Sequence, residues 1–199
     1  MDSKPLAKTL RQPMVWVGLI AGFSLAVGVH EWPYINWKKA APPVDQLPLV
    51  IRQDAKGDGR FGSRRSGSRR HRGVDLAAAL NSPVRAIRSG TVVQVGNHRG
   101  LGNYVELEHQ AGLRSLYAHL NSVQVEAGAR VRQAEVLGSV GKTGNAKHPW
   151  ITPHVHLEVV KDNHSIDPVL IGLRIADTRA SAIPSAVGQD ESLDAEGGE

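Results

Sequence analysis

The middle of this chain alternates apolar and polar residues with a period of two, and glycines interrupt the runs. This alternation is typical of β-strands and occurs over residues 91–95, 104–108, 113–119, 136–140 and 155–160. Turn signals, such as residues 99–102 and 141–144, separate the runs. No long stretch shows the 3.6-residue period of a helix. The pattern predicts a mainly β domain of antiparallel strands over residues 49–172.

Cysteine is absent from the 199 residues, although apolar residues, at 41%, suffice for a core. The absence excludes a disulfide scaffold, a thiolate zinc site and a cysteine nucleophile. Any bound metal would therefore need His, Asp or Glu as its ligands. The net charge of +5 does not identify a partner, because the placement of the charges matters more than their sum.

The N-terminal part carries a membrane signal. Residues 14–29 are uncharged and mostly apolar, and three basic residues precede them within the flank 1–13, which we expect in the cytoplasm. We interpret residues 14–37 as a transmembrane signal-anchor, whose outer end is marked by aromatic residues, or as a signal peptide cleaved near Ala26 and Gly28. The flanking charges and aromatics argue against a buried core helix. Either interpretation exports residues 38–199 across the membrane.

Two further segments lack the alternating pattern. Residues 38–48 contain three prolines, which predicts an extended linker. Residues 173–199 end in a stretch with five acidic and no basic residues, which predicts an acidic disordered tail. The domain is therefore expected to lie between a linker and a tail.

One strand-like run carries two of the nine histidines, His154 and His156. Because side chains alternate along a strand, both imidazoles would face one side, with Val155, Leu157 and Val159 on the other. In isolation, two polar residues on a solvated face would give the same pattern. The pair alone is therefore weak evidence for a metal.

Two more patterns strengthen the case. His71 precedes Asp75 by four residues, and Gly73 argues for a loop leading into a strand, with Asp75 facing away from the core. His119 lies in another strand-like run. Two imidazoles and one carboxylate form the kind of ligand set that catalytic Zn²⁺ uses, with a fourth position left for water.

These patterns belong to a larger series. In chain order, the motifs are Gly59–Gly62, His71–Ala78, Pro83–Ala86, Ser89–Val92, Gly102–Val105, Tyr117–Leu120, Gly138–Gly144 and His154–Glu158. Over residues 57–169 the series resembles the lysostaphin-type (LytM-like) peptidoglycan zinc metalloendopeptidases. The resemblance implies an antiparallel β-sheet groove, of the duplicated hybrid motif kind, with one Zn²⁺ at its floor. It also implies hydrolysis of peptide bonds in the bacterial cell wall.

The resemblance assigns roles by position. His71, Asp75 and His156 match the zinc ligands, whereas His119 and His154 match the two catalytic histidines that do not bind the metal. Which of these two is the general base is left open. Because all five are present, the chain does not resemble the degenerate members of the family, which lack ligands and activate other hydrolases.

The chain departs from the family in a basic segment. Arg52–Arg72 holds eight bases and two acids. Where staphylococcal members have a tyrosine that assists the transition state, this chain has Arg64 and Arg65, which we take as candidate substrate-binding residues. The segment is either a solvated mobile loop or a groove edge that contacts carboxylates of peptidoglycan. The segment has few aromatic residues among its bases, and an exported domain meets little nucleic acid, so we do not expect it to bind nucleic acid. Residues 145–152 also form a longer loop than is usual, so the groove border is expected to differ.

The sequence thus predicts a membrane-tethered or exported zinc endopeptidase that acts on peptidoglycan stem peptides or cross-bridges during cell-wall remodelling. One alternative is a non-catalytic wall-binding or hydrolase-regulating module of the same fold, which leaves room for a regulatory protein partner. Another is a basic adaptor whose histidines are structural. The bond that is cleaved does not follow from the sequence.

Overall fold

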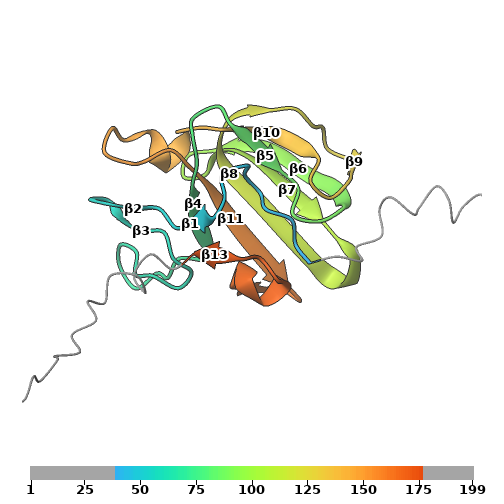
Figure 1. The fold of residues 1–199 in the computed structure, drawn as a ribbon, viewed down its shortest axis with the longest axis horizontal. Coiled ribbons are helices and arrows are strands. Elements are labelled where there is room, and N and C mark those ends of the chain that lie inside the picture. The colour runs from blue at the N-terminus through green and yellow to red at the C-terminus, as the bar shows by residue number, and fades with distance from the viewer. Residues whose placement is uncertain (1–38, 177–199) are drawn as a thin grey trace, which may run out of the picture.

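A nine-stranded antiparallel sheet forms the frame of the domain (Figure 1). The structure is a computed structural model and describes residues 39–176. The main path of the sheet runs through β12 (His164–Ile166), β11 (His154–Lys161), β8 (Leu113–Val123), β7 (Gly102–Glu108), β6 (Gly90–His98) and β9 (Arg130–Val131). Beside this path lie β4 (Gly73–Ala77) against β11, and β10 (Val136–Val140) against β8 and β5 (Pro83–Arg85). The prediction of a mainly β, antiparallel fold is confirmed.

Two small two-stranded sheets lie outside the main sheet. In one, β1 (Leu49–Val50) pairs in parallel with β13 (Ile175–Ala176). In the other, β2 (Gln53–Asp54) and β3 (Gly57–Asp58) form an antiparallel hairpin. The helical turns are of the 3₁₀ type: η2 (Gln110–Gly112), η3 (Gly144–Lys147) and η4 (Pro168–Ile171). Within residues 39–176, no helix is long and apolar enough to cross a bilayer.

The alternation in β11 separates the core from the site. Val155, Leu157 and Val159 are fully buried in the core, whereas His154 and His156 face the opposite side, toward Asp75. This is the side-chain arrangement that the period-two pattern predicts. The core therefore fixes the face on which the histidines lie.

The packed unit extends beyond residues 49–172 at both ends. Val44, in the segment interpreted as a linker, is buried and forms a β-bridge with Val84. At the other end, Leu173 is buried and β13 pairs with β1. The predicted membrane segment and most of the predicted acidic tail lie outside the described residues.

Two glycines meet where η3 passes the start of β7. Gly144 has φ +60°, and a Cβ there would lie 2.2 Å from Gly102 N and 2.5 Å from Gly100 O. We expect Gly144→Ala to lower the free energy of unfolding by about 2–5 kcal/mol. An alanine in the left-handed region costs about 1–2 kcal/mol, and the overpacking by its Cβ costs about 1–3 kcal/mol. Urea denaturation measures the change. Gly67→Ala is the matched control, since Gly67 has φ +71° but open space around its Cβ position. Equal losses in both variants would contradict the steric argument.

Candidate active site

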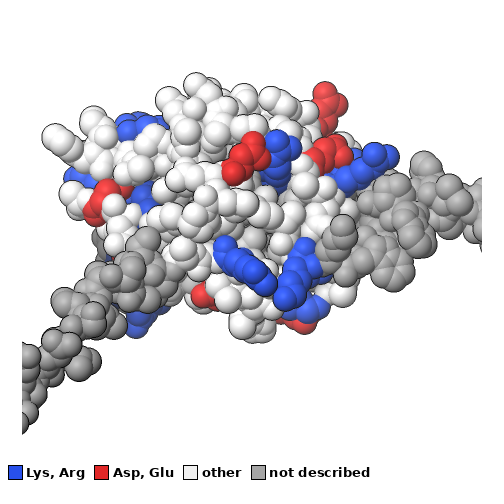
Figure 2. Space-filling view, in the orientation of Figure 1, with Lys and Arg blue, Asp and Glu red and all other residues white. Residues whose placement is uncertain are grey.

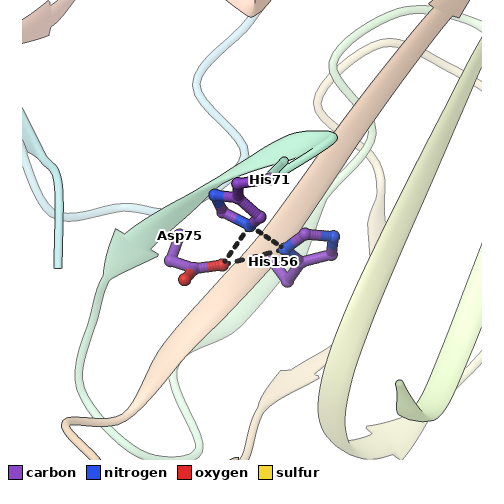
Figure 3. A group of neighbouring side chains, drawn as sticks. All are labelled: His71, Asp75 and His156. Atoms are coloured by element: carbon purple, nitrogen blue, oxygen red, sulfur yellow. Dashed lines mark hydrogen bonds and ion pairs between the residues drawn. The ribbon is translucent and has the colours of Figure 1, made fainter. Parts of the chain in front are cut away.

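The register between β4 and β11 brings Asp75 and His156 together. Each lies directly opposite the other in the ladder, and His71 lies two residues before β4 (Figure 3). Asp75 Oδ1 is 2.8 Å from His156 Nδ1 and 3.2 Å from His71 Nε2, and the two ring nitrogens are 3.0 Å apart. All three residues are buried. The structure thus gathers the three residues that the sequence analysis assigns to the metal.

The remaining ring nitrogens of both histidines have partners that orient them. His71 Nδ1 donates to Arg60 O at 2.9 Å, and His156 Nε2 donates to Glu158 Oε1 at 3.2 Å. In the metal-bound state, protons at these two positions would leave the lone pairs of His71 Nε2 and His156 Nδ1 available to the ion. Without metal, His156 Nδ1 carries a proton and donates to Asp75 Oδ1. Outer partners of this kind are typical of metal-ligating histidines.

The spacing of the three ligand atoms fits a small divalent ion. Ligand atoms of a tetrahedral zinc site lie about 2.0–2.2 Å from the metal, and so about 3.3 Å from one another. The separations of 2.8–3.2 Å among His71, Asp75 and His156 are close to that value. Two imidazoles and a carboxylate are also donors that zinc prefers. The residues present therefore fit zinc.

Electrostatics favour positive charge at this cluster. Burial raises the pKa of Asp75, but hydrogen bonds and charges from His156 and His71 outweigh it and hold the pKa well below its usual range. Burial lowers the pKa of His156, yet Asp75 and Glu158 raise it to about 9. The carboxylate is thus ionised at neutral pH, which is the state that a metal ligand needs.

A bulge in β8 turns His119 toward this cluster. Tyr117 is buried in the core, so a regular strand would also place His119 on the core side. Instead, His119 has φ +64°, and the β7–β8 register slips so that Asn103–Val105 faces the longer stretch Tyr117–Leu120. A bulge of this kind re-aims a side chain. The centroid of the His119 ring lies 5.0 Å from that of His154.

His119 and His154 share one hydrogen-bonding pattern. His119 Nδ1 donates to Thr143 O at 3.0 Å, and His154 Nδ1 donates to Thr152 O at 2.7 Å. Each Nε2 therefore keeps a free lone pair. The Nε2 atom of His154 lies 3.9 Å from Asp75 Oδ1. The structure places both residues beside the three candidate ligands.

Both of these histidines are neutral at neutral pH. Burial, followed by the charges of His154 and His156, lowers the pKa of His119 to about 3. Burial is also the main cause that lowers the pKa of His154. A neutral imidazole with a free lone pair can accept a proton, and the pKa of about 3 makes His119 a weak base at neutral pH.

A groove of about 850 Å³ holds the five residues. The long loop 145–152 borders it through Asn145, Ala146 and Ile151. The border also includes the arginine-rich segment, which folds back on itself through a bridge between Arg64 and Arg70. The loop that the sequence analysis singled out thus lies at the groove.

The arginines of this segment have different surroundings. Arg65 contacts Asp75 Oδ2 at 3.2 Å and also donates to Asp58 O, whereas Arg64 is exposed and does not line the groove. Arg69 and Arg70 are exposed, line the groove and donate only to backbone carbonyls within residues 39–176. On the face in Figure 2, Lys and Arg side chains are scattered among acidic ones. Arg69 and Arg70 are therefore the arginines best placed for a ligand in the groove.

Two neighbours of the candidate ligands, Glu158 and Arg52, have no role at the site assigned from the sequence. Glu158 lies two residues after His156 on the same strand face, so the alternation itself could have indicated it. Arg52 contacts Asp75 Oδ2 at 3.0 Å from a segment 23 residues away, and no local pattern marks it.

Comparisons with known proteins agree with this geometry. Residues 69–168, half of the chain, match the model of peptidase family M23. The DD-carboxypeptidase/endopeptidase Mpg of Neisseria meningitidis is 34% identical over 127 residues, which cover 64% of this chain and 28% of Mpg. The chain thus spans less than a third of this relative.

Two solved structures have similar folds. A zinc containing peptidase from Vibrio cholerae has a TM-score of 0.54 at 28% identity, over 67% of this chain and 40% of that chain. The SpoIIQ–SpoIIIAH pore forming complex contains a chain with a TM-score of 0.54 at 26% identity, over 73% of this chain and 98% of that chain. Since the family match includes the candidate ligands and both neighbouring histidines, this chain belongs to peptidase family M23.

Proposed function

We propose that this protein is a zinc-dependent endopeptidase that hydrolyses peptide bonds in peptidoglycan cross-links. The observation that carries the proposal is the convergence of three metal-ligand atoms beside two neutral histidines with free lone pairs. The relatives support the class of reaction, because one is named a DD-carboxypeptidase/endopeptidase and another a zinc containing peptidase.

His71, Asp75 and His156 would hold the metal. A zinc ion bound by them supplies Lewis acidity, which lowers the pKa of water and polarises a peptide carbonyl. Arg52 and Arg65 hold the second oxygen of Asp75, so that the first faces the two ring nitrogens. The chain thus prepares the carboxylate for its role before any substrate binds.

His119 and His154 carry the proton transfers. The free Nε2 of one ring accepts the proton of the attacking water, while Thr143 O or Thr152 O holds Nδ1 and stabilises the imidazolium that forms. That Nε2–H then faces the leaving amine nitrogen, to which it returns the proton. The second ring, whose Nε2 also carries a lone pair, accepts a hydrogen bond from the attacking water and helps to orient it.

Digestion of purified peptidoglycan tests the proposal. The full chain should release fragments whose masses correspond to cleaved peptide bonds, and a chelator should stop the release until zinc is restored. The masses also identify the bond. If the chain binds peptidoglycan and zinc but releases no fragment, it is not an endopeptidase.

A second candidate function is that of a non-catalytic partner protein. The similarity to a chain of the SpoIIQ–SpoIIIAH complex favours it, because that chain is known in an assembly with another protein. The intact set of five residues argues for the enzyme instead. The digestion above separates the two, since a partner protein would leave the peptide bonds intact.

We also propose that the arginine-rich segment binds substrate, through residues beyond Arg64 and Arg65. Arg69 and Arg70 would hold carboxylates of peptidoglycan stem peptides, because a guanidinium binds a carboxylate through paired hydrogen bonds. Arg65 acts through Asp75, and Arg64 contacts substrate only beyond the groove border.

We expect the double change Arg69→Ser and Arg70→Ser to weaken peptidoglycan binding by about tenfold, since hydrogen bonds to charged groups contribute about 1.5–3 kcal/mol when formed and exposure reduces this. A sedimentation assay measures the binding, and the difference should shrink at high salt. Arg174→Ser, a loss of charge at an exposed residue outside the groove, is the control. Equal weakening in that control would point to net charge rather than to a site.

The proposed location is outside the cytoplasmic membrane. The uncharged run 14–29 with its basic flank supports either an inner-membrane anchor, with the domain in the periplasm, or secretion after cleavage. Protease added to spheroplasts should digest the domain in both cases. Only an anchored chain should remain in the membrane fraction.

A further inference from the structure

Arg52 is a buried cation that lies between two carboxylates, directly behind the candidate metal ligands. It is 5% exposed; its Nη2 is 3.0 Å from Asp75 Oδ2, and its Nη1 is 2.7 Å from Asp54 Oδ1. Its Nε is buried and donates to no acceptor within residues 39–176. Burying a guanidinium costs free energy unless charges compensate it. The two carboxylates therefore determine where this side chain lies.

The backbone fixes the same arrangement. Arg52 N donates to Asp75 O at 2.8 Å, Asp75 N donates to Gly59 O at 2.8 Å, and Gly59 N donates to Arg52 O at 2.9 Å. A Cβ on Gly59 would lie 2.7 Å from Asp75 Cβ, so only glycine permits this approach. The β2–β3 hairpin and its flanks are thus held against the strand that carries Asp75.

Asp54 connects Arg52 to the residues that precede His154. Its Oδ2 accepts a hydrogen bond from Thr152 N at 3.0 Å, and Thr152 O accepts one from His154 Nδ1 at 2.7 Å. The Thr152 side chain is exposed, and its two backbone groups make these bonds. A continuous series of contacts therefore connects Asp75, Arg52, Asp54, Thr152 and His154.

We propose that Arg52 and Asp54 are positioning residues, and that this series couples the metal ligand Asp75 to the orientation of His154. The inference rests on the proposed function, since it assigns effects on zinc binding and on hydrolysis. Arg52 fixes one oxygen of Asp75, so that the other faces the ring nitrogens. Asp54 fixes the Thr152 peptide, so that Nε2 of His154 faces the site. Arg52 therefore acts mainly on Asp75, and Asp54 acts mainly on His154.

Measurements of zinc affinity, kcat and KM on the full chain distinguish the role of Arg52 from that of Asp54. Arg52→Met should lower zinc affinity by about 10–100-fold, the usual cost of losing an outer partner of a metal ligand. Asp54→Ala should lower zinc affinity less than Arg52→Met does, because Arg52 keeps its contact with Asp75, and should lower kcat by about tenfold at constant KM, because His154 loses its orientation. Asp54→Asn keeps an acceptor oxygen for Thr152 N and should restore most of kcat.

One control variant matches these changes. Asp58→Asn removes the same charge from the same hairpin and should retain the zinc affinity and kcat of the original chain. NMR provides a readout that a loss of stability would not give. The Nδ1–H signal of His154 should exchange faster with solvent in Asp54→Ala than in Asp58→Asn.

Each result decides for or against the coupling. It is wrong if Arg52→Met keeps full zinc affinity, or if Asp54→Ala leaves the His154 signal and kcat unchanged. Should Arg52→Met fail to fold, Arg52→Lys takes its place and should show an intermediate zinc affinity. If the unaltered chain cleaves no peptidoglycan, the proposed function fails, while zinc affinity and the His154 signal still decide the coupling.

Discussion

His156→Ala should abolish hydrolysis and sharply weaken zinc binding, because it removes one of the three candidate metal ligands. His156 offers Nδ1 to the cluster and anchors its ring through Glu158, so the variant loses a ligand and its orientation together. We expect zinc affinity to fall by more than about 100-fold, since losing an outer partner alone costs about 10–100-fold. Metal analysis after dialysis measures the zinc, and peptidoglycan digestion measures the activity.

His164→Ala is the control for this prediction. His164 is an exposed histidine on β12, and it should retain stoichiometric zinc and full hydrolysis when replaced. Stoichiometric zinc in the His156→Ala variant would show that the metal binds elsewhere. The assignment of His71 and Asp75 would then be wrong as well.

His119→Ala should separate chemistry from metal binding. Its ring lies beside the three ligand atoms, and its Nδ1 donates to Thr143 O, so its loss leaves all three ligands in place. We expect stoichiometric zinc and a fall in kcat of about 10²–10⁴-fold, the usual contribution of a general acid or base. The same metal analysis and digestion apply.

His154→Ala is the companion to this variant. It should also retain zinc, because Nε2 of His154 is 3.9 Å from Asp75 Oδ1, farther than either candidate ligand nitrogen. Comparison of the two pH–rate profiles then shows which residue acts as the base. Loss of zinc in His119→Ala would overturn the division between ligands and catalytic histidines.

The strands and their faces were predictable because burial imposes a simple period. In β11, the core requires Val155 and Leu157 on one face, which places His154 and His156 on the other. Asp75 follows the same logic, because its neighbours Val74 and Leu76 are buried. These predictions needed only the alternation of buried and site-facing residues within a single strand.

The contacts that complete the site depend on tertiary structure. The bulge at His119 follows from the pairing of β8 with β7, and the sequence Tyr117–Leu120 alone does not reveal an extra residue. Arg52 reaches Asp75 only because the chain folds back beside β4. The division of the arginine-rich segment, with Arg65 on a metal ligand and Arg69 at the groove, likewise depends on how that segment turns. Such contacts join distant segments, so no short window of sequence contains them.

The ladder between β4 and β11 ties activity to completed folding. Asp75 and His156 are 81 positions apart in the chain and meet only in one register. A slip by one residue would turn the partner's side chain to the opposite face and leave no ligand set. A metal that binds the native state alone would in turn stabilise this register by mass action. An unfolded chain would therefore have no ligand set and none of the proposed hydrolytic activity, so that activity would begin only when the β4–β11 ladder has formed.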